Sequence, residues 1–365
     1  MKILIDIGHP AHVHYFRNFI KIMENKGHKF LITSRNKEIE HYLLNSYNIP
    51  FIGRGKGEKG VFGKIIYLLK ADYLIFKYAL KFKPDIFLSF GSTYAGHVAF
   101  LRKKQHIAFD DTEHAKYEHL MYKPFTNIIL TPSCFNKNMG KKQIRFDGYM
   151  ELCYLHPNRF TPDASVLDLL GVKQDEKYVI IRFVSWNASH DIGQSGLNIE
   201  KKHEIVKELS KYAKVFISSE GELPEDLKKY QIKIPPEKMH HALAFATLFV
   251  GEGATMASEC ACLGTPAIYV NSLTAGTLEE QERYRLLFGF RNSEGVIEKA
   301  IELLNTPNLK QEFQQRRQKM LSDKIDVTAF MVWFVENYPE SAKIMKENPE
   351  YQWRFREKCI SGVVE

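Results

Sequence analysis

Short apolar runs alternate with longer amphipathic segments along the whole chain, which is the pattern of a parallel α/β fold. The chain starts with an apolar run at 3–8, continues with an amphipathic segment that ends before Gly27, and becomes apolar again at 30–33. Continuous runs of this kind are typical of strands that are buried on both faces of a sheet. Further strands are predicted at 84–92, 107–109, 127–131, 178–183, 215–219, 243–250 and 267–270.

The 365 residues are enough for two domains, each with its own core. We predict a first domain at 1–155, a linker with two prolines at 156–176, a second domain at 177–324, and a helical, aromatic tail at 325–365.

The most informative stretch is 248–272, which predicts a strand, a tight turn, a short helix and a second strand. Gly251 and Gly253 form the turn, and Gly264 closes the helix. The free N–H groups at the start of such a helix form an anion site, and Glu259 is placed to reach a sugar hydroxyl of the same ligand. The alternative is that the two glycines only make a tight connection.

Three histidines follow the first predicted strand, at His9, His12 and His14. Their spacing lacks the helical pair and the nearby glutamate of a zinc protease, so no metal site is expected. Ligands of α/β folds bind at the carboxyl ends of the strands, which favours a functional role for at least one of the three. His12 is the candidate.

A cluster of ionisable residues follows the predicted strand at 107–109, and its candidates for acid/base chemistry are Asp111, Glu113 and His114. Neighbouring carboxylates shift each other's pKa values apart, so that one group is protonated while the other is ionised, as acid/base chemistry requires. An alternative, compatible with the first, is that Asp111 or Thr112 caps a helix that runs on from Ala115.

Two basic segments follow one another in the first domain. Glycines alternate with charges at 53–60, which predicts a mobile loop beside the acceptor site or a plain linker. Lysines are interspersed among apolar residues at 61–83, which predicts a helix. This helix either lies on an anionic membrane surface or turns its apolar stripe to the core.

The net charge of +8 is concentrated in the first domain. Residues 1–155 carry 24 Lys and Arg against 13 Asp and Glu, which suits an anionic partner such as anionic lipid or a phosphate-linked acceptor. A lysine-rich soluble surface would give the same count. Because the chain has no nucleic-acid-binding motif, nucleic acid is not an expected partner.

The overall composition, 44% hydrophobic and 26% charged, is that of a globular protein. No stretch of 18 residues lacks a charge, so no membrane span is predicted, and the chain starts with a strand rather than a signal segment. Five cysteines without paired spacing predict reduced thiols and no zinc site. These features predict a cytoplasmic protein, peripheral at the inner face of the membrane if the basic helix binds there.

The predicted strand at 178–183 leads into a polar loop at 184–198. In a doubly wound domain this loop faces the same edge of the sheet as the Gly251–Gly253 turn. Arg182, Ser185 and His190 are therefore candidates for binding a diphosphate or a sugar.

The glycine turn resembles the donor-nucleotide motif of GT-B glycosyltransferases and of the non-hydrolysing UDP-N-acetylglucosamine 2-epimerases. The matching residues are Gly253-Ala254-Thr255-Met256-Ala257-Ser258-Glu259, followed by Gly264-Thr265-Pro266. The resemblance implies that the backbone amides of Gly253, Ala254, Thr255 and Met256 hold the diphosphate and that Glu259 holds the ribose hydroxyls.

Other segments extend the GT-B resemblance. His12-Val13 matches the end of the Gly-Gly-His-Val loop of the lipid II-pathway N-acetylglucosaminyltransferase, although Pro10 and Ala11 replace the glycines. The resemblance also implies that the segment around Met239 borders the nucleobase. It further implies that a predicted helix at 278–288 brings Glu280 and Gln281 to the donor sugar.

Over nearly its full length the chain also resembles a bacterial and archaeal family of unknown function, through the following motifs. They are Pro10-Ala11-His12-Val13-His14, Asp111-Thr112-Glu113-His114-Ala115, Tyr154-Leu155-His156-Pro157 and 251–259. Together the resemblances imply a GT-B protein with two Rossmann-like domains facing a cleft and a tail that returns to the first domain.

The hypothesis is a glycosyltransferase that moves a sugar from a UDP-linked donor to a glycan or lipid-linked acceptor in surface polysaccharide assembly. It would need no cofactor and no metal, because the Asp-x-Asp metal motif is missing. Its base would be His12, or Glu113 with His114. The alternatives are a UDP-sugar 2-epimerase, which would use Asp111 and Glu113 for proton removal and return, and a non-catalytic nucleotide-sugar-binding protein.

Overall fold

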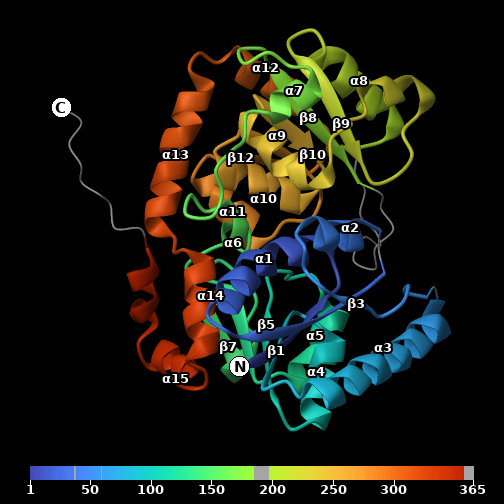
Figure 1. Ribbon diagram of the computed structural model, residues 1–365. Coiled ribbons are helices and arrows are strands. Elements are labelled where there is room, and N and C mark those ends of the chain that lie inside the picture. The colour runs from blue at the N-terminus through green and yellow to red at the C-terminus, as the bar shows by residue number, and fades with distance from the viewer. Residues whose placement is uncertain (37, 59, 185–196, 357–365) are drawn as a thin grey trace. The chain divides into compact units, whose positions relative to one another are not determined.

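The computed structural model describes residues 1–36, 38–58, 60–184 and 197–356 (Figure 1). The chain forms two compact units. Unit 1 combines Met1–Tyr154 with Ile325–Glu365, and unit 2 is Leu155–Lys324. Residues 156–176, expected as a linker, include the helix α7, Val166–Leu170, whose Val166 and Leu167 are buried in unit 2.

Unit 1 is built on a parallel sheet of seven strands in the order β3-β2-β1-β4-β5-β6-β7. Its strands are β1 Lys2–Ile7, β2 Lys29–Ser34, β3 Ile52–Gly53, β4 Ile86–Phe90, β5 Gln105–Phe109, β6 Ile128–Pro132 and β7 Gln143–Phe146. The order reverses between β1 and β4, which is where a doubly wound sheet opens a ligand crevice at the carboxyl ends of its strands.

Helices cover both faces of this sheet (Figure 1). They are α1 Pro10–Asn25, α2 Glu38–Ser46, α3 Gly60–Phe82, α4 Thr93–Leu101, α5 Lys116–Tyr122 and α6 Leu152–Leu155, with 3-10 turns at Lys123–Phe125 and Gly140–Lys142. The core forms because β1 is apolar on both faces, and Ile3, Leu4, Ile5 and Ile7 have no exposed surface.

The tail returns to unit 1, as the sequence predicts. It consists of α14 Val327–Glu336, α15 Glu340–Glu347 and a 3-10 helix at Pro349–Phe355. The Thr328 hydroxyl donates to the carbonyl oxygen of Cys153 at 2.7 Å. The Phe330 ring stacks on Phe146 at a centroid distance of 5.8 Å. The apolar face of the tail is therefore part of the core of unit 1.

Unit 2 contains a parallel sheet of five strands in the order β12-β11-β10-β8-β9. The strands are β8 Tyr178–Phe183, β9 Lys214–Ser219, β10 Leu248–Gly251, β11 Ala267–Val270 and β12 Leu287–Phe290. The further helices are α8 Ile199–Leu209, α9 Met239–Phe245, α10 Ala254–Leu263, α11 Gly276–Arg283, α12 Val296–Asn305 and α13 Leu309–Asp323, with 3-10 turns at Glu225–Tyr230 and Pro236–Lys238. The strand order reverses between β8 and β10, so the ligand crevice is expected there.

Two predicted elements in unit 2 are wrong. The apolar run at 243–250 is not one strand, because 243–245 form the last turn of α9 and β10 starts at Leu248. The helix predicted at 278–288 ends at Arg283, because Arg285 takes a left-handed conformation and Leu287–Phe290 pair with β11 as the strand β12. In the part of the chain that the structure describes, no helix is long and apolar enough to cross a bilayer.

His106 makes the stability of unit 1 dependent on pH. Its ring lies on β5 with no exposed surface, between the hydroxyl groups of Ser89 and Thr126 at 2.9 Å each. Burial lowers the pKa of His106 from 6.5 to about 3. The unfolded chain therefore binds a proton that the folded chain excludes, and the free energy of unfolding falls as the pH falls from about 6.5 to about 3.

We expect His106→Gln to flatten this pH dependence. Urea unfolding of the wild type and the variant, measured near neutral pH and at about pH 5, compares the two slopes. His114→Gln is the matched control, because the His114 side chain is exposed. Equal slopes for the wild type and His106→Gln would contradict this account.

Candidate functional site

The turn between β10 and α10 has the geometry of an anion site. Gly253 is the N-cap of α10, and among the described residues no side chain caps this helix. The amides of Ala254, Thr255 and Met256 occupy the first turn, where a helix leaves its N–H groups without partners inside the helix. These amides carry the positive end of the helix dipole, which attracts an anion such as a diphosphate.

The two glycines of this turn differ in the space around them. A Cβ atom on Gly251 would lie 2.7 Å from Cζ of Phe249 and 2.8 Å from Cβ of Arg182, so the packing of β10 against β8 requires glycine. A Cβ atom on Gly253 would meet its nearest neighbour, Cγ1 of Val184, at an ordinary 3.5 Å. The packing around Gly253 therefore does not require a glycine, unlike that around Gly251.

Glu252, which sequence analysis did not single out, organises the loop beside this turn. Its carboxylate is buried and accepts the N–H groups of Val184 at 3.1 Å and Leu197 at 2.6 Å. The ammonium of Lys202 lies 3.5 Å from the same carboxylate. Glu252 thus fixes both ends of the segment that contains Ser185 and His190, two candidates that lie outside the described residues. Its position between two glycines gave no sign of this role.

Arg182 lies one residue before the end of β8, where it pairs with Gly251 of the glycine turn. Its guanidinium donates to Ser218 at 2.7 Å and to Glu220 at 2.8 Å. The Arg182 carbonyl oxygen accepts the N–H of Glu252, so its backbone also supports the turn. The guanidinium of Arg182 is therefore held against β9 and the residue that follows it, with its charge paired to Glu220.

Glu259 is held on α10 by a buried histidine. Its Oε1 lies 2.9 Å from Nε2 of His240 on α9, and the side chains of Glu259 and His240 are 6% and 5% exposed. This pair fixes the orientation of the Glu259 carboxylate, as binding of a ribose by the same carboxylate requires. Sequence analysis missed His240, although it identified its neighbour Met239, the first residue of α9.

The two candidates on α11 make internal contacts. Glu280 forms an ion pair with the buried Lys324 at 2.8 Å. Gln281 has no exposed surface, and its amide donates to the Ser258 hydroxyl at 2.8 Å. In this structure Gln281 therefore packs α11 against α10 and supports the helix that carries Glu259.

In unit 1, His12 lies at the other switch point. It is on the first turn of α1, and its ring contacts Phe90 at the end of β4 with a centroid distance of 4.7 Å. Nδ1 of His12 accepts the N–H of Gly8 at 3.3 Å, so in the neutral ring the proton is on Nε2. In this tautomer the Nε2–H group of His12 is a hydrogen-bond donor.

A buried ion pair joins β1 to the segment at 53–60. Asp6 on β1 accepts Nε of Arg54 at 2.9 Å, and Arg54 also donates to the hydroxyl of Tyr67 at 2.5 Å. The prediction of a mobile loop at 53–60 is wrong at Arg54, which is 5% exposed, because the buried Asp6 needs a counter-ion. The short strand β3 leads directly into this segment.

The carboxylates after β5 have distinct environments. Asp110 is buried and accepts the Tyr122 hydroxyl and the N–H of Thr112 at 2.9 Å, and Nε2 of His119 lies 3.0 Å from its carboxylate. Asp111 is only partly buried and accepts the Thr112 hydroxyl at 3.2 Å. The capping alternative is wrong, because α5 starts after Ala115 and has no side-chain cap.

Asp111 has the pKa shift expected of an acid/base group. Burial raises its pKa well above the ordinary value, and the negative charges of Glu151, Asp110 and Glu113 raise it further. Glu113 instead accepts the N–H of Asn136 at 3.1 Å, and His114 is exposed. Asp111 is therefore the strongest candidate for acid/base chemistry among the four residues predicted for catalysis in unit 1.

Within the described residues, no three His, Cys, Asp or Glu side chains gather in a way that could hold a metal ion. At the start of α1 the rings of His9 and His12 lie 5.7 Å apart and His12 contacts Phe90, whereas His14 stacks on Tyr154 at 5.2 Å.

The sequence model of a family described as "protein of unknown function (DUF354)" matches residues 1–340. A relative, an uncharacterised protein of Methanocaldococcus jannaschii, is 25% identical over 281 residues, which are 73% of this chain and 81% of that protein.

Among solved structures, S. aureus MnaA with UDP superposes with a TM-score of 0.67, at 13% identity, over 93% of this chain and 97% of that one. The UDP-GlcNAc 2-epimerase of Neisseria meningitidis bound to UDP-GlcNAc gives 0.66, at 12% identity, over 96% and 100%. The Streptomyces sp. SF2575 glycosyltransferase SsfS6 gives 0.60, at 12% identity, over 92% and 100%. The chain therefore has the GT-B fold, which both enzyme classes share.

Proposed function

We propose that this chain, which belongs to the DUF354 family, is a glycosyltransferase that moves a sugar from a UDP-linked donor to an acceptor. The observation that carries the proposal is the turn at Gly253, where a helix start without a side-chain cap lies at the switch point of unit 2. A UDP-sugar supplies the two phosphates that such a turn binds.

In this proposal the first-turn amides of α10 bind the diphosphate and stabilise the negative charge that develops on it when the sugar leaves. The Arg182 side chain, ion-paired with Glu220 in this structure, is a further candidate for contact with the diphosphate. Glu259, oriented by His240, accepts hydrogen bonds from the ribose hydroxyls. In this proposal these groups stabilise the leaving nucleotide, and neither a metal nor a cofactor takes part.

The acceptor hydroxyl needs a base, and we assign that role to Asp111. An ionised carboxylate with a raised pKa accepts a proton more readily than an ordinary aspartate. His12, with its proton on Nε2, would donate a hydrogen bond to a substrate oxygen. The acceptor is a glycan or a lipid-linked glycan of surface polysaccharide assembly, which is the setting that the GT-B resemblance implies.

One observation favours a second function, a UDP-sugar 2-epimerase. Asp111 lies among other carboxylates, and such a group suits removal of a sugar proton and its return. The GT-B neighbours include enzymes of this name as well as glycosyltransferases. Transfer needs a second substrate and epimerisation does not, so the products separate the two.

The test is a panel of nucleotide sugars incubated with the protein, with and without glycan acceptors, and read by mass spectrometry. Transfer releases UDP only when acceptor is present, whereas epimerisation leaves an altered sugar on UDP. Donor that binds but never changes would identify a non-catalytic binding protein.

Glu259→Gln is expected to weaken donor binding at least about tenfold, because an amide cannot accept two ribose hydroxyls as a carboxylate does. Binding is measured by titration calorimetry, and thermal unfolding reports whether the loss of the His240 pair alters the fold. Glu282→Gln on α11 is the control carboxylate. Unchanged affinity of Glu259→Gln for every UDP-sugar would contradict the assignment.

A further inference from the structure

The helix α3 has apolar side chains on two opposite faces. On the inner face Ala71, Ile75 and Ala79 have no exposed surface and pack in the core of unit 1. On the outer face the exposed fractions reach 83% for Phe62 and 69% for Tyr73. The remaining exposed apolar residues of α3 are Ile65, Ile66, Leu69 and Leu80. A helix at the surface of a soluble protein usually turns a polar face outward, so this outer face lacks a partner in the described structure.

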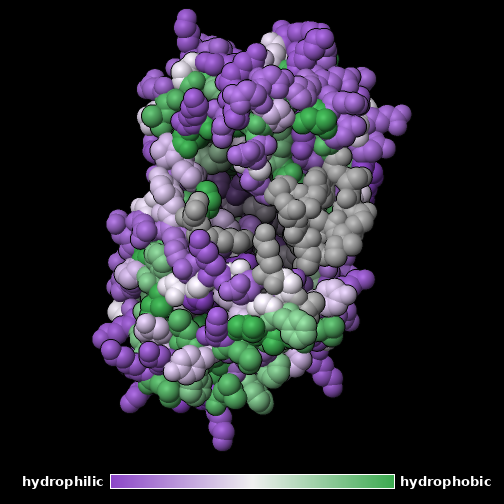
Figure 2. All heavy atoms as spheres, turned by 90° about the vertical axis from the view of Figure 1, so that its right-hand side faces the viewer, coloured by the Kyte–Doolittle hydropathy of each residue, from purple (hydrophilic) through white to green (hydrophobic). Residues whose placement is uncertain are grey.

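The neighbouring helices extend this face. α3 contacts α4, and α4 contacts α5. Phe100 and Leu101 at the end of α4 are exposed, as are Tyr117, Leu120 and Met121 on α5. Figure 2 shows apolar side chains gathered over the lower part of this view, the part of unit 1 that carries these helices. We call these eleven residues the outer apolar face. Contiguous exposed apolar patches of this kind mark interaction surfaces.

Positive charge borders the outer apolar face. Lys70, Lys77 and Lys81 are seven and four residues apart, which places them on one flank of α3. The one acidic residue of α3, Asp72, is bound to His97 at 2.8 Å. The flank is therefore electropositive over the second half of the helix.

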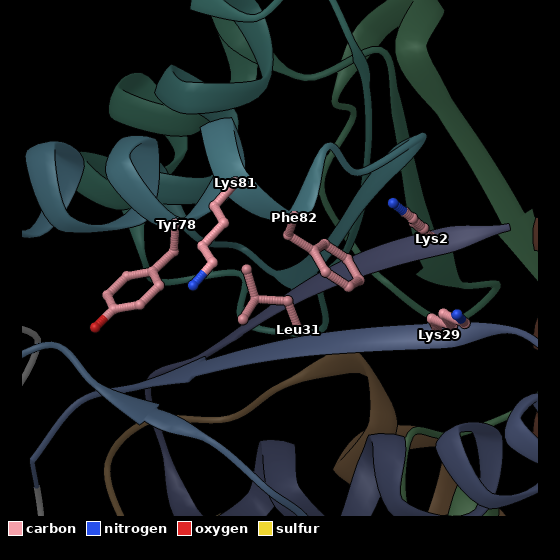
Figure 3. Close-up of a pocket in the computed structure, with 6 residues that line it drawn as sticks. All are labelled: Lys2, Lys29, Leu31, Tyr78, Lys81 and Phe82. Atoms are coloured by element: carbon pink, nitrogen blue, oxygen red, sulfur yellow. The ribbon is translucent and has the colours of Figure 1, made fainter.

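The positive flank ends at a hollow of about 370 Å³. Lys81 lines this hollow together with Lys2 and Lys29, at the amino ends of β1 and β2. Figure 3 shows Leu31 and the Phe82 ring between Lys81 on one side and Lys2 and Lys29 on the other. Three ammonium groups around an apolar floor suit the phosphate and the upper carbons of a lipid headgroup.

We propose that the outer apolar face of α3, α4 and α5 binds the surface of an anionic bilayer, with α3 lying in the plane of the interface. Apolar residues enter the headgroup region while the lysines of the flank contact lipid phosphates. A second copy of the chain is a poorer occupant, because a symmetric contact would bring the lysine flanks of two copies together. The proposal goes beyond the sugar-transfer activity, and lipid binding by this face requires no nucleotide.

The test is co-sedimentation of the full chain with vesicles of phosphatidylcholine, with and without phosphatidylglycerol, in the absence of nucleotide. We expect binding to the phosphatidylglycerol vesicles that weakens with salt. Leu69→Ser with Tyr73→Ser, and separately Lys70→Glu with Lys77→Glu, should each reduce binding at least about tenfold. The residues are exposed, so thermal unfolding should be unchanged.

The matched controls lie on unit 2. Leu169→Ser replaces a leucine that is 54% exposed, against 64% for Leu69, and Lys207→Glu with Lys229→Glu reverses two exposed lysines. These variants should bind vesicles as the wild type does. Equal binding of the wild type to neutral and anionic vesicles would overturn the proposal. The proposal would also be overturned if the wild type did not bind vesicles but self-associated, and the Leu69→Ser/Tyr73→Ser variant did not self-associate. That result would identify a protein interface.

A failure here is distinguishable from a failure of the proposed activity, because vesicle binding and UDP-sugar binding are measured separately. A wild type that binds UDP-sugars but no vesicles would remove the membrane proposal alone.

Discussion

Gly253→Ala is expected to lower the affinity for UDP-sugars by about tenfold to a hundredfold, while the protein stays folded. The added methyl group meets Val184 and Arg182 at ordinary contact distances, so the fold accepts it. It stands, however, at the turn where the diphosphate must approach the backbone. Titration calorimetry with a UDP-sugar measures the affinity, and thermal unfolding measures the stability.

Gly251→Ala is the matched control, two residues away. Its methyl group would lie 2.7 Å from Phe249 and 2.8 Å from Arg182, so β10 and β8 would have to separate. We expect this variant to lower the stability by about 1–3 kcal/mol. If Gly253→Ala bound UDP-sugars as tightly as the wild type, the diphosphate would not lie at this turn.

Asp111→Asn is expected to reduce turnover by about a hundredfold to ten-thousandfold, with donor binding retained. Asparagine keeps the shape of the side chain but cannot accept a proton. In the wild type, turnover should rise with pH through the raised pKa of Asp111, because only the ionised carboxylate is a base. The pH–rate profile of the wild type and the residual rate of the variant test this. A surface variant, Asp168→Asn, should leave both unchanged.

The same substitution should also stabilise the protein at neutral pH. Because the pKa of Asp111 is higher in the folded state than in the unfolded state, folding favours its protonated form. The free energy of unfolding of the wild type therefore falls as the pH rises from about 3.8 through the raised folded pKa. Asparagine does not ionise, so the free energy of unfolding of the variant does not fall in this way as the pH rises. Urea unfolding that shows Asp111→Asn less stable than the wild type at neutral pH would contradict the assignment.

The turn at 251–264 could be predicted from the sequence because its signals are local. Two glycines end an apolar run, small residues begin a helix, and Gly264 takes the left-handed conformation that ends it. The β12 strand could not be predicted in the same way. Neither proline nor glycine separates α11 from Leu287, and only pairing with β11 makes that run a strand.

The residues that support the site were missed for a different reason. Asp6 is a charge inside an apolar strand, which was a visible signal, but its counter-ion Arg54 comes 48 residues later. Likewise the buried partner of Glu259, His240, lies 19 residues earlier on another helix. Such pairs depend on how elements pack, and hydrophobic periodicity carries no information about them.

The central claim is that unit 2 binds a uridine diphosphate at the start of α10. The most direct measurement is a calorimetric titration of UDP into the wild type and into Gly253→Ala under the same conditions. The account predicts saturable, one-to-one binding to the wild type that is at least about tenfold weaker in the variant. A wild type that binds neither UDP nor any UDP-sugar would contradict it.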